Sequence, residues 1–228
     1  MKIPKRAAFY ISLSAIILYW LYVIFFTASS VPVLPNSLIE ILLSIVKNKV
    51  IFILAVIILL LLEGESIINL GFRKQKLLLQ LIFGISLGFI TWILVNIVFN
   101  PLINAVNSGA LKPPGDILNY MKDPSSLYLW IPVVMLAAFS EELQRIFVLT
   151  RFEKWFGKYG LYLAVLITSV IFGIGHLYQG MNAAIGTGIG GLLNSFVYLR
   201  KRSAIEVIIC HAVFNILSVV GGFLMNNK

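Results

Sequence analysis

The chain has 228 residues, of which 60% are hydrophobic and only 12% are charged. A soluble domain typically carries about 25% charged residues, so this composition excludes an ordinary soluble protein. Uniformly apolar runs of about 20 residues predict helices that span a bilayer, whereas a membrane β-barrel would alternate apolar and polar residues in shorter strands. We therefore expect an all-α fold, a polytopic transmembrane helical bundle.

Seven apolar segments are long enough to be predicted as membrane spans. They cover residues 7–27, 50–69, 77–100, 126–150, 159–177, 180–199 and 203–225. The first exceeds the apolar part of a signal peptide, so we expect it to be retained as a span. A shorter run at 37–46 precedes Lys47 and Lys49, and we expect it to lie at the interface or to re-enter the membrane.

The longest predicted loop, about residues 100–125, divides three spans from four. It contains Pro113-Pro114-Gly115, which stops any helix. The loop either caps the bundle or serves as a plain connector. We expect an N-terminal membrane region at 1–125 and a C-terminal core at 126–225, within one structural domain.

The basic residues indicate the orientation of the chain in its membrane. If the N-terminus is cytoplasmic, twelve of the 18 Lys and Arg fall on the inner side, five on the outer side, and Arg145 lies inside a span. This distribution predicts an integral multi-pass protein of the cell membrane with a cytoplasmic N-terminus. Orientation and contact with anionic lipid account for the net charge of +9, so no nucleic-acid partner is expected.

Two adjacent glutamates and an arginine interrupt the fourth predicted span. Each charge in hydrocarbon costs about 2.5–3.5 kcal/mol, so such groups pair, face a cavity or take part in chemistry. On a helix, Arg145 lies four residues after Glu141 and three after Glu142, so we expect both carboxylates to reach its guanidinium. One glutamate would then suit a general base. The structural alternative is a buried ion pair that locks helix packing.

Both histidines of the chain lie in the C-terminal spans. His176 ends the fifth span, and His211 lies one helical turn before Asn215 in the last, where both side chains can donate to a developing oxyanion. The alternative for His211 and Asn215 is an interhelical polar clamp. Glu206 is expected to pair with Arg202, four residues before it. Two acids, an arginine, two imidazoles and an amide together outline the hydrolysis of an amide.

Small residues are concentrated in the sixth predicted span. Residues 186–191 match the letters of a dinucleotide-binding fingerprint, but no strand precedes them and no βαβ unit surrounds them. Gly186 with Gly190, and Ala184 with Gly188, are spaced by four and favour close helix packing in a bilayer.

Three motifs, each in its own span, resemble those of the CPBP family, which comprises type II CaaX prenyl endopeptidases, Abi proteins, and bacteriocin-processing or immunity proteins. They read Glu141-Glu142-Leu-Gln-Arg145, Phe172-Gly-Ile-Gly-His176 and His211-Ala-Val-Phe-Asn215, and the stretch NLGFRKQK before the third span is also similar. The family motif has three residues between the glutamates and the arginine, and here there are two. Which glutamate is the base is therefore left open.

The resemblance implies a membrane-embedded endopeptidase acting on a peptide or protein substrate, including lipid-modified ones. In this implied assignment Glu141 and His176 activate water, Glu142 and Arg145 support the site, and His211 with Asn215 holds the tetrahedral oxygen. No cofactor is expected. The alternative is a zinc enzyme with Glu141, His176 and His211 as ligands, although the chain lacks an HExxH helix. Two other classes remain: a non-catalytic scaffold or bacteriocin self-immunity factor, and a transporter that relays protons.

Overall fold

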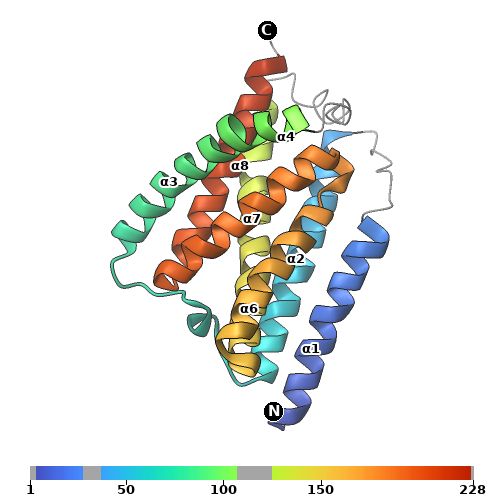
Figure 1. Cartoon of the computed structure of the whole chain (residues 1–228), viewed down its shortest axis with the longest axis vertical. Helices are drawn as coiled ribbons and strands as arrows, with labels where there is room; N and C mark the ends of the chain where they lie inside the picture. The colour runs from blue at the N-terminus through green and yellow to red at the C-terminus, as the bar shows by residue number, and fades with distance from the viewer. Residues whose placement is uncertain (1–3, 28–36, 107–124, 227–228) are drawn as a thin grey trace.

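A computed structural model describes residues 4–27, 37–106 and 125–226, and regular structure in these ranges is helical throughout. Figure 1 shows long helices packed side by side, with the N-terminus and C-terminus at opposite ends of the molecule. The elements in order are α1 Lys5–Tyr22 with a π-helical turn Val23–Thr27, α2 Leu38–Leu62, a 3-10 turn Ile67–Leu70, α3 Leu77–Ile93 with a π-helical turn Leu94–Phe99, α4 Asn100–Val106, α6 Ser125–Ile174, a 3-10 turn Leu177–Gln179, α7 Met181–Lys201 and α8 Ala204–Asn226.

The predicted fold class is confirmed: the protein is an all-α helical bundle with several helices suited to a membrane. In the described ranges, five helices are long and apolar enough to cross a bilayer, within α1, α2, α3–α4, α6 and α8. The predicted sixth span forms α7, which is not among these five because its sequence carries many Gly, Asn and Ser residues. The count of seven spans stays a prediction.

The N-terminal part of α2 corrects one prediction. Residues 38–46, which were predicted as a separate short segment, form the first part of a single helix, Leu38–Leu62. Ser37 caps this helix by accepting a hydrogen bond from the backbone of Glu40, at 3.3 Å. Lys47 and Lys49 therefore lie within α2 rather than in an outer loop.

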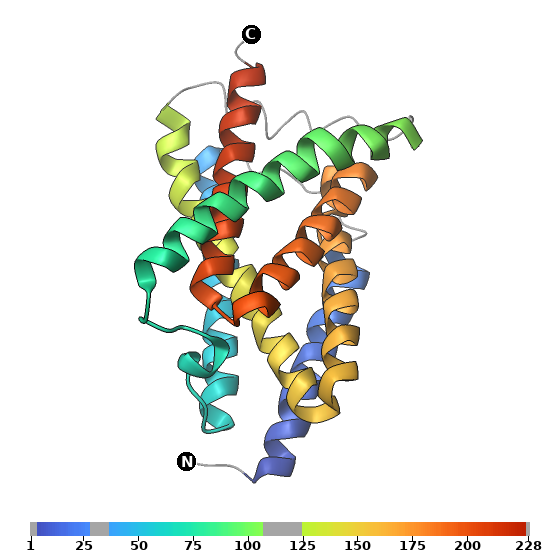
Figure 2. The same cartoon turned by 60° about the vertical axis from the view of Figure 1, so that its left-hand side comes forward.

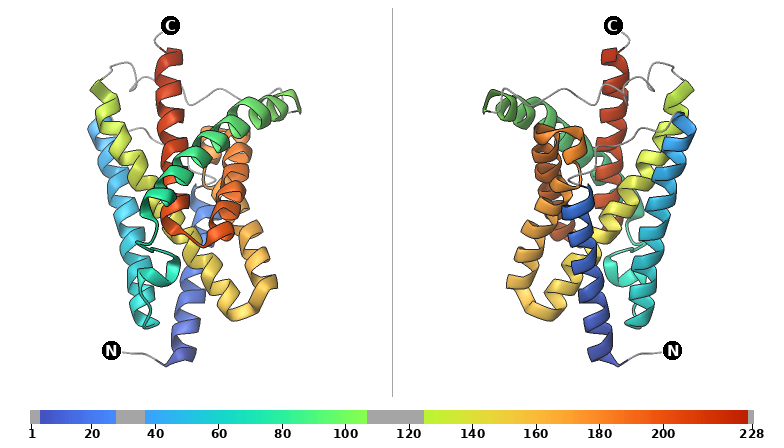
Figure 3. Two further views of the ribbon diagram at one scale, coloured as in Figure 1. Left: turned by 90° about the vertical axis from the view of Figure 1, so that its left-hand side faces the viewer. Right: turned by 90° about the vertical axis from the view of Figure 1, so that its right-hand side faces the viewer.

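α6 joins the predicted fourth and fifth spans at a sharp bend. Gly157 has φ 65° and ψ −156°, which no helical residue adopts and which glycine reaches most readily. Figure 3 shows the two arms of α6 meeting at this bend in a V, so that the chain reverses its direction there. The helix continues through residues 151–156, where the prediction had placed a loop.

The third predicted span is also longer than expected. α3 passes through a π-helical turn into α4, so that the apolar helix runs from Leu77 to Val106. The rest of the predicted long loop, residues 107–124, lies outside the described residues, and its role as cap or connector is untested.

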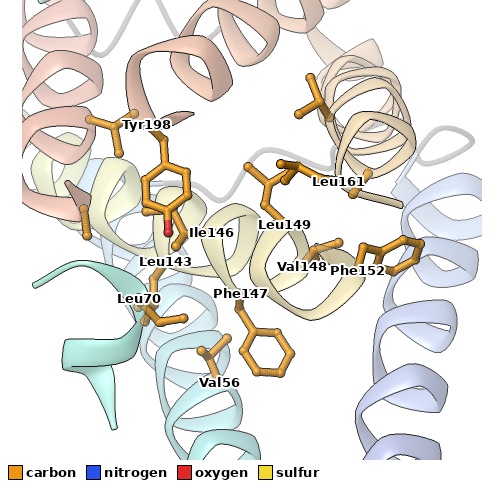
Figure 4. Packing of buried hydrophobic residues seen from close by; sticks show 14 of the residues in the cluster. Val56, Leu70, Leu143, Ile146, Phe147, Val148, Leu149, Phe152, Leu161 and Tyr198 are labelled. Carbon is orange, nitrogen blue, oxygen red and sulfur yellow. The ribbon is translucent and has the colours of Figure 1, made fainter. Parts of the chain in front are cut away.

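The largest apolar core surrounds the first arm of α6. Ile146, Phe147 and Leu149 are at most 2% exposed and point toward different neighbours. Figure 4 shows them between Val56 of α2 and Tyr198 of α7, with Leu161 of the second α6 arm nearby. The first arm of α6 is therefore held from several directions at once, which fixes the side chains that it carries.

Small residues let α3 approach α8, and α7 approach α6, closely. α3 crosses α8 diagonally (Figure 2), and a Cβ at Gly84 or Gly88 would come within 2.8 Å of α8 backbone oxygens. Between α6 and α7, a Cβ at Gly173 would lie 2.7 Å from the Ala184 carbonyl, and one at Gly188 would lie 3.3 Å from the Ser169 carbonyl. The packing role predicted for Ala184 and Gly188 agrees with these contacts, whereas a Cβ at Gly190 would meet no atom within 4 Å, so the role predicted for Gly190 is wrong.

Candidate functional site

Glu142 lies at the meeting point of α6, α7 and α8. It is completely buried, and its Oε1 accepts hydrogen bonds from the Arg145 guanidinium, from Asn194 Nδ2 at 2.9 Å and from His211 Nδ1 at 2.7 Å. Its Oε2 has no hydrogen-bond partner among the described residues. Arg145 is itself 4% exposed, so this is a buried ion pair with two added polar contacts.

Glu141 faces a different helix from its neighbour. Its Oε1 accepts from Lys49 Nζ of α2 at 2.6 Å, and its Oε2 lies 3.5 Å from His211 Nε2. Adjacent residues on a helix point about 100° apart, which accounts for the separate partners. The prediction that both glutamates pair with Arg145 is therefore wrong for Glu141, and each carboxylate has its own cation.

His211 links the two glutamates across the site. One ring nitrogen contacts Glu142 and the other lies near Glu141, so a single imidazole of α8 fixes the spacing of both carboxylates. Phe172 lies beside this ring, with centroids 5.8 Å apart. The same phenyl ring supports the Arg145 guanidinium, whose carbon lies 4.5 Å from the ring centroid.

His176 follows the end of α6 in a short turn. Its Nδ1 lies 2.8 Å from the Phe172 carbonyl, which can only accept, so Nδ1 carries the proton of that hydrogen bond. In the neutral ring, Nε2 then carries a lone pair. The Phe172 ring contacts both imidazoles, with its centroid 4.8 Å from that of His176 and 5.8 Å from that of His211, so the structure brings both histidines to one place.

Asn215 lies one turn beyond His211 on α8, as the spacing predicts. Its side-chain amide donates to the Val134 carbonyl of α6 at 3.4 Å, which joins the two helices. That contact fits the interhelical clamp that the sequence left open. The role of Asn215 as an oxyanion donor stays a prediction.

Glu206 is separate from this site, and its predicted partner is wrong. It pairs with Arg200, and more distantly with Lys201 at 3.9 Å. Arg202 instead binds Glu153 through two hydrogen bonds of 2.6 and 2.8 Å. The change arises because α7 ends at Lys201 and Arg202 adopts a left-handed conformation, so Arg202 and Glu206 do not share a helix.

A mostly apolar cavity of about 210 Å³ opens beside Glu141. It lies among α1, α2 and both arms of α6, and Gln144 and Arg145 add polar groups to its wall. The other lining residues include Ile16, Tyr19, Trp20, Phe52, Val56, Leu59, Val148, Ile171 and Phe172. Such a lining can hold an apolar group next to a few oriented polar atoms.

Sequence reasoning missed two residues of the site, Lys49 and Asn194. Lys49 was placed in an outer loop because the apolar run appeared to break at Lys47. The pattern Ser37-Leu-Ile-Glu40 is a helix-start signature and would have predicted one helix running through both lysines. Asn194 had no signal beyond being a polar residue in an apolar stretch.

The donor groups do not form a metal site as arranged. Among the residues that the structure describes, no three His, Cys, Asp or Glu side chains are grouped so that they could hold a metal ion. Lys49 occupies one oxygen of Glu141, the first of the three suggested zinc ligands with His176 and His211. We therefore derive no step through zinc.

Comparison with known proteins bears on the C-terminal part of the chain. No curated protein and no solved structure matches it. Residues 123–217 match a family model described as type II CAAX prenyl endopeptidase Rce1-like. This range contains the glutamate pair, Arg145, both histidines and Asn215, whereas Lys49 lies outside it. This part of the chain, somewhat less than half of its length, is therefore similar to the CAAX-type intramembrane proteases of that family.

Proposed function

We propose that the protein hydrolyses a peptide bond of a membrane-associated substrate, with Glu141 as the general base. The exposure of the two carboxylates carries this assignment. Glu141 borders the apolar cavity and its side chain is 15% exposed, whereas that of Glu142 is fully buried. A general base must reach the water from which it takes a proton, and Glu141 is the glutamate that can.

His176 supplies the second contact to this water. Its Nε2 lone pair is available in the neutral ring to accept a hydrogen bond from that water. In the proposed step Glu141 takes a proton from a water molecule that His176 orients. The resulting hydroxide forms a bond to the carbonyl carbon of the substrate. Glu141 then gives the proton to the leaving nitrogen as the carbon–nitrogen bond breaks.

Glu142 and Arg145 position the rest of the site. Glu142 holds the His211 ring by accepting a hydrogen bond from its Nδ1. As an imidazolium, His211 then presents its Nε2–H toward Glu141 and the tetrahedral oxygen. We assign His211 and Asn215 to that oxygen, where hydrogen-bond donors stabilise developing charge most strongly.

Lys49 balances the charge of the proposed base. Its ammonium group keeps the Glu141 carboxylate ionised in apolar surroundings, as Arg145 does for Glu142. The charges of Lys49 and Arg145 thus balance those of the two carboxylates. This assignment draws α2, which lies outside the matched family range, into the site.

The cavity favours a substrate with an apolar group close to the bond that is cut. An apolar side chain or a covalently attached lipid chain fits such a lining, and prenylated peptides belong to this class. The test is cleavage by the full chain in lipid nanodiscs of one peptide sequence, with and without a prenyl group. Glu141→Gln should lower turnover by about 10²–10⁴-fold. The control Glu40→Gln, an exposed carboxylate of α2, should match the wild type.

A second candidate is a non-catalytic scaffold or bacteriocin self-immunity factor of the same family. The contacts of Glu142 with Arg145, Asn194 and His211 favour it, because such a buried network also locks three helices together. This candidate requires that wild type and Glu141→Gln cleave neither the prenylated nor the unprenylated peptide and protect cells equally against the bacteriocin. Cleavage that survives exhaustive chelation would exclude the zinc alternative.

A further inference from the structure

A second hollow lies at the far end of α2 from Ser37, remote from the glutamate site. The segment between α2 and α3 folds back over α6 and the turn between α7 and α8. Gly71 permits this fold-back, because its backbone has φ 99° and a Cβ there would overlap the Arg202 carbonyl. The Gly71 carbonyl also accepts a hydrogen bond from Ala204 N at 3.2 Å. The hollow enclosed by these elements has a volume of about 280 Å³.

Cationic side chains outnumber carboxylates in the lining of this hollow. Its charged residues are Arg73, Arg151, Lys154, Arg202, Glu65 and Glu153. Both carboxylates are already engaged: Glu153 binds Arg202, and Glu65 binds Arg151 and Lys154, each at 2.6 Å. Arg73 is exposed, and no carboxylate in the described part of the chain forms an ion pair with it.

An unmet donor lies in the wall of the same hollow. The Arg151 side chain is 2% exposed and donates to Glu63 and Glu65 through its two terminal nitrogens. Its Nε has no hydrogen-bond partner among the described residues. Buried donors are nearly always satisfied, so an unmatched one beside an unpaired arginine indicates an acceptor that comes from outside the chain.

The location indicates which anion this would be. The hollow lies where α2 leaves its apolar stretch and close to the bend of α6, at the level expected for lipid headgroups. We propose that it binds the phosphate group of an anionic phospholipid headgroup, with Arg73 as its main charge contact. Such sites between helix ends typically use clustered basic residues. The proposal does not depend on any catalytic activity.

The test is native mass spectrometry of the full chain in detergent, titrated with phosphatidylglycerol or with phosphatidylcholine. The wild type should bind phosphatidylglycerol in preference. Arg73→Gln should weaken that binding about fivefold, the effect of one basic residue near an anionic lipid. Lys74→Gln is the matched control, because it removes the same charge from the next residue, which does not line the hollow.

Three results would overturn the proposal. Equal binding of the two lipids would remove the headgroup preference, and equal losses in Arg73→Gln and Lys74→Gln would show a diffuse charge effect. Thermal stabilisation by inorganic phosphate without any preference for the anionic lipid would assign the hollow to a free anion. Unchanged thermal midpoints of both variants in neutral lipid would show that they remain folded.

Discussion

Two clusters of charge lie between α2 and α6, and they are built from the same parts. The central cluster comprises Lys49, Glu141, Glu142, Arg145 and His211, and the end cluster comprises Glu63, Glu65, Arg151 and Lys154. Each holds two carboxylates and two basic side chains of Lys and Arg, with contacts of 2.6 Å across the helix interface. Their polarity across the interface is reversed, since α2 contributes the cation Lys49 to the central cluster, whereas the segment that follows α2 contributes both acids to the end cluster.

The clusters differ in what surrounds them. The central cluster has an imidazole between its carboxylates and an apolar cavity at one of them. The end cluster has no histidine, and its Lys154 side chain is half exposed. Ion pairs inside a helical membrane protein therefore do not mark a reactive site by themselves. The titratable ring and the cavity beside one carboxylate distinguish a site for chemistry from a clamp between helices.

The same substitution in both clusters gives the largest expected contrast. Glu141→Gln should reduce peptide cleavage by about 10²–10⁴-fold without unfolding the chain, because the amide cannot accept the proton of water. Glu63→Gln should retain the turnover of wild type per folded molecule. Cleavage rates normalised to the monodisperse fraction measure both. A comparable loss of turnover in Glu63→Gln would mean that the clusters do not differ as argued.

Glu142→Gln should act on folding as well as on activity. It leaves Arg145 buried without its counter-charge, which typically costs about 3–5 kcal/mol. Unfolding in mixed micelles, followed by circular dichroism, measures the loss. Combining it with Arg145→Met removes the unpaired charge and should recover part of the stability but not the activity. If the double variant is no more stable than Glu142→Gln alone, the buried ion pair does not account for the loss.

The sequence predicted which side chains lie together better than it predicted which of them pair. Spacing placed Glu141, Glu142, His176 and His211 in apolar helices, and the structure brings them together. Residue spacing could not show that the second arm of α6 and α8 approach each other around Phe172, because that approach depends on tertiary packing. The pairing of Glu141 with Arg145 failed because helix spacing alone ignores partners that neighbouring helices supply.

The fold was predicted by composition, and its boundaries were less certain. Long apolar runs sufficed for a polytopic helical bundle, since the bilayer permits few alternatives. Lys47 and Lys49 of α2 were interpreted as the boundary of a membrane span, although the charge of Lys49 is neutralised by Glu141 of α6. The bend at Gly157 was predicted as a loop, because a single glycine with an unusual backbone conformation leaves little trace in a pattern of hydropathy.

Lys49→Met tests what the cation of α2 contributes to the central cluster. Without the ammonium group, Glu141 is favoured in its protonated form in apolar surroundings, so cleavage at neutral pH should fall by tens of fold and recover at higher pH. Lys49→Arg keeps the charge and should retain most activity. Lys47→Met is the control, since Lys47 is exposed on the same helix. A pH profile of Lys49→Met parallel to that of wild type would refute the proposed role of the charge.

The end cluster should show the smallest effect, and in stability rather than in activity. Burial raises the pKa of the Glu65 carboxyl, but hydrogen bonds from Arg151 and Lys154 outweigh burial and hold that pKa below its ordinary value of 4.5. Because the folded pKa is the lower one, the stabilising contribution is complete above the ordinary value and is lost as the pH falls through the folded value.

Glu65→Gln lacks this contribution, which should be below about 1 kcal/mol because Lys154 is half exposed. The thermal midpoints of wild type and Glu65→Gln should thus differ slightly at pH 7 and converge as the pH falls below about 4.5. A gap that widens on acidification would contradict the paired state of Glu65 and with it the interpretation of the end cluster as a clamp.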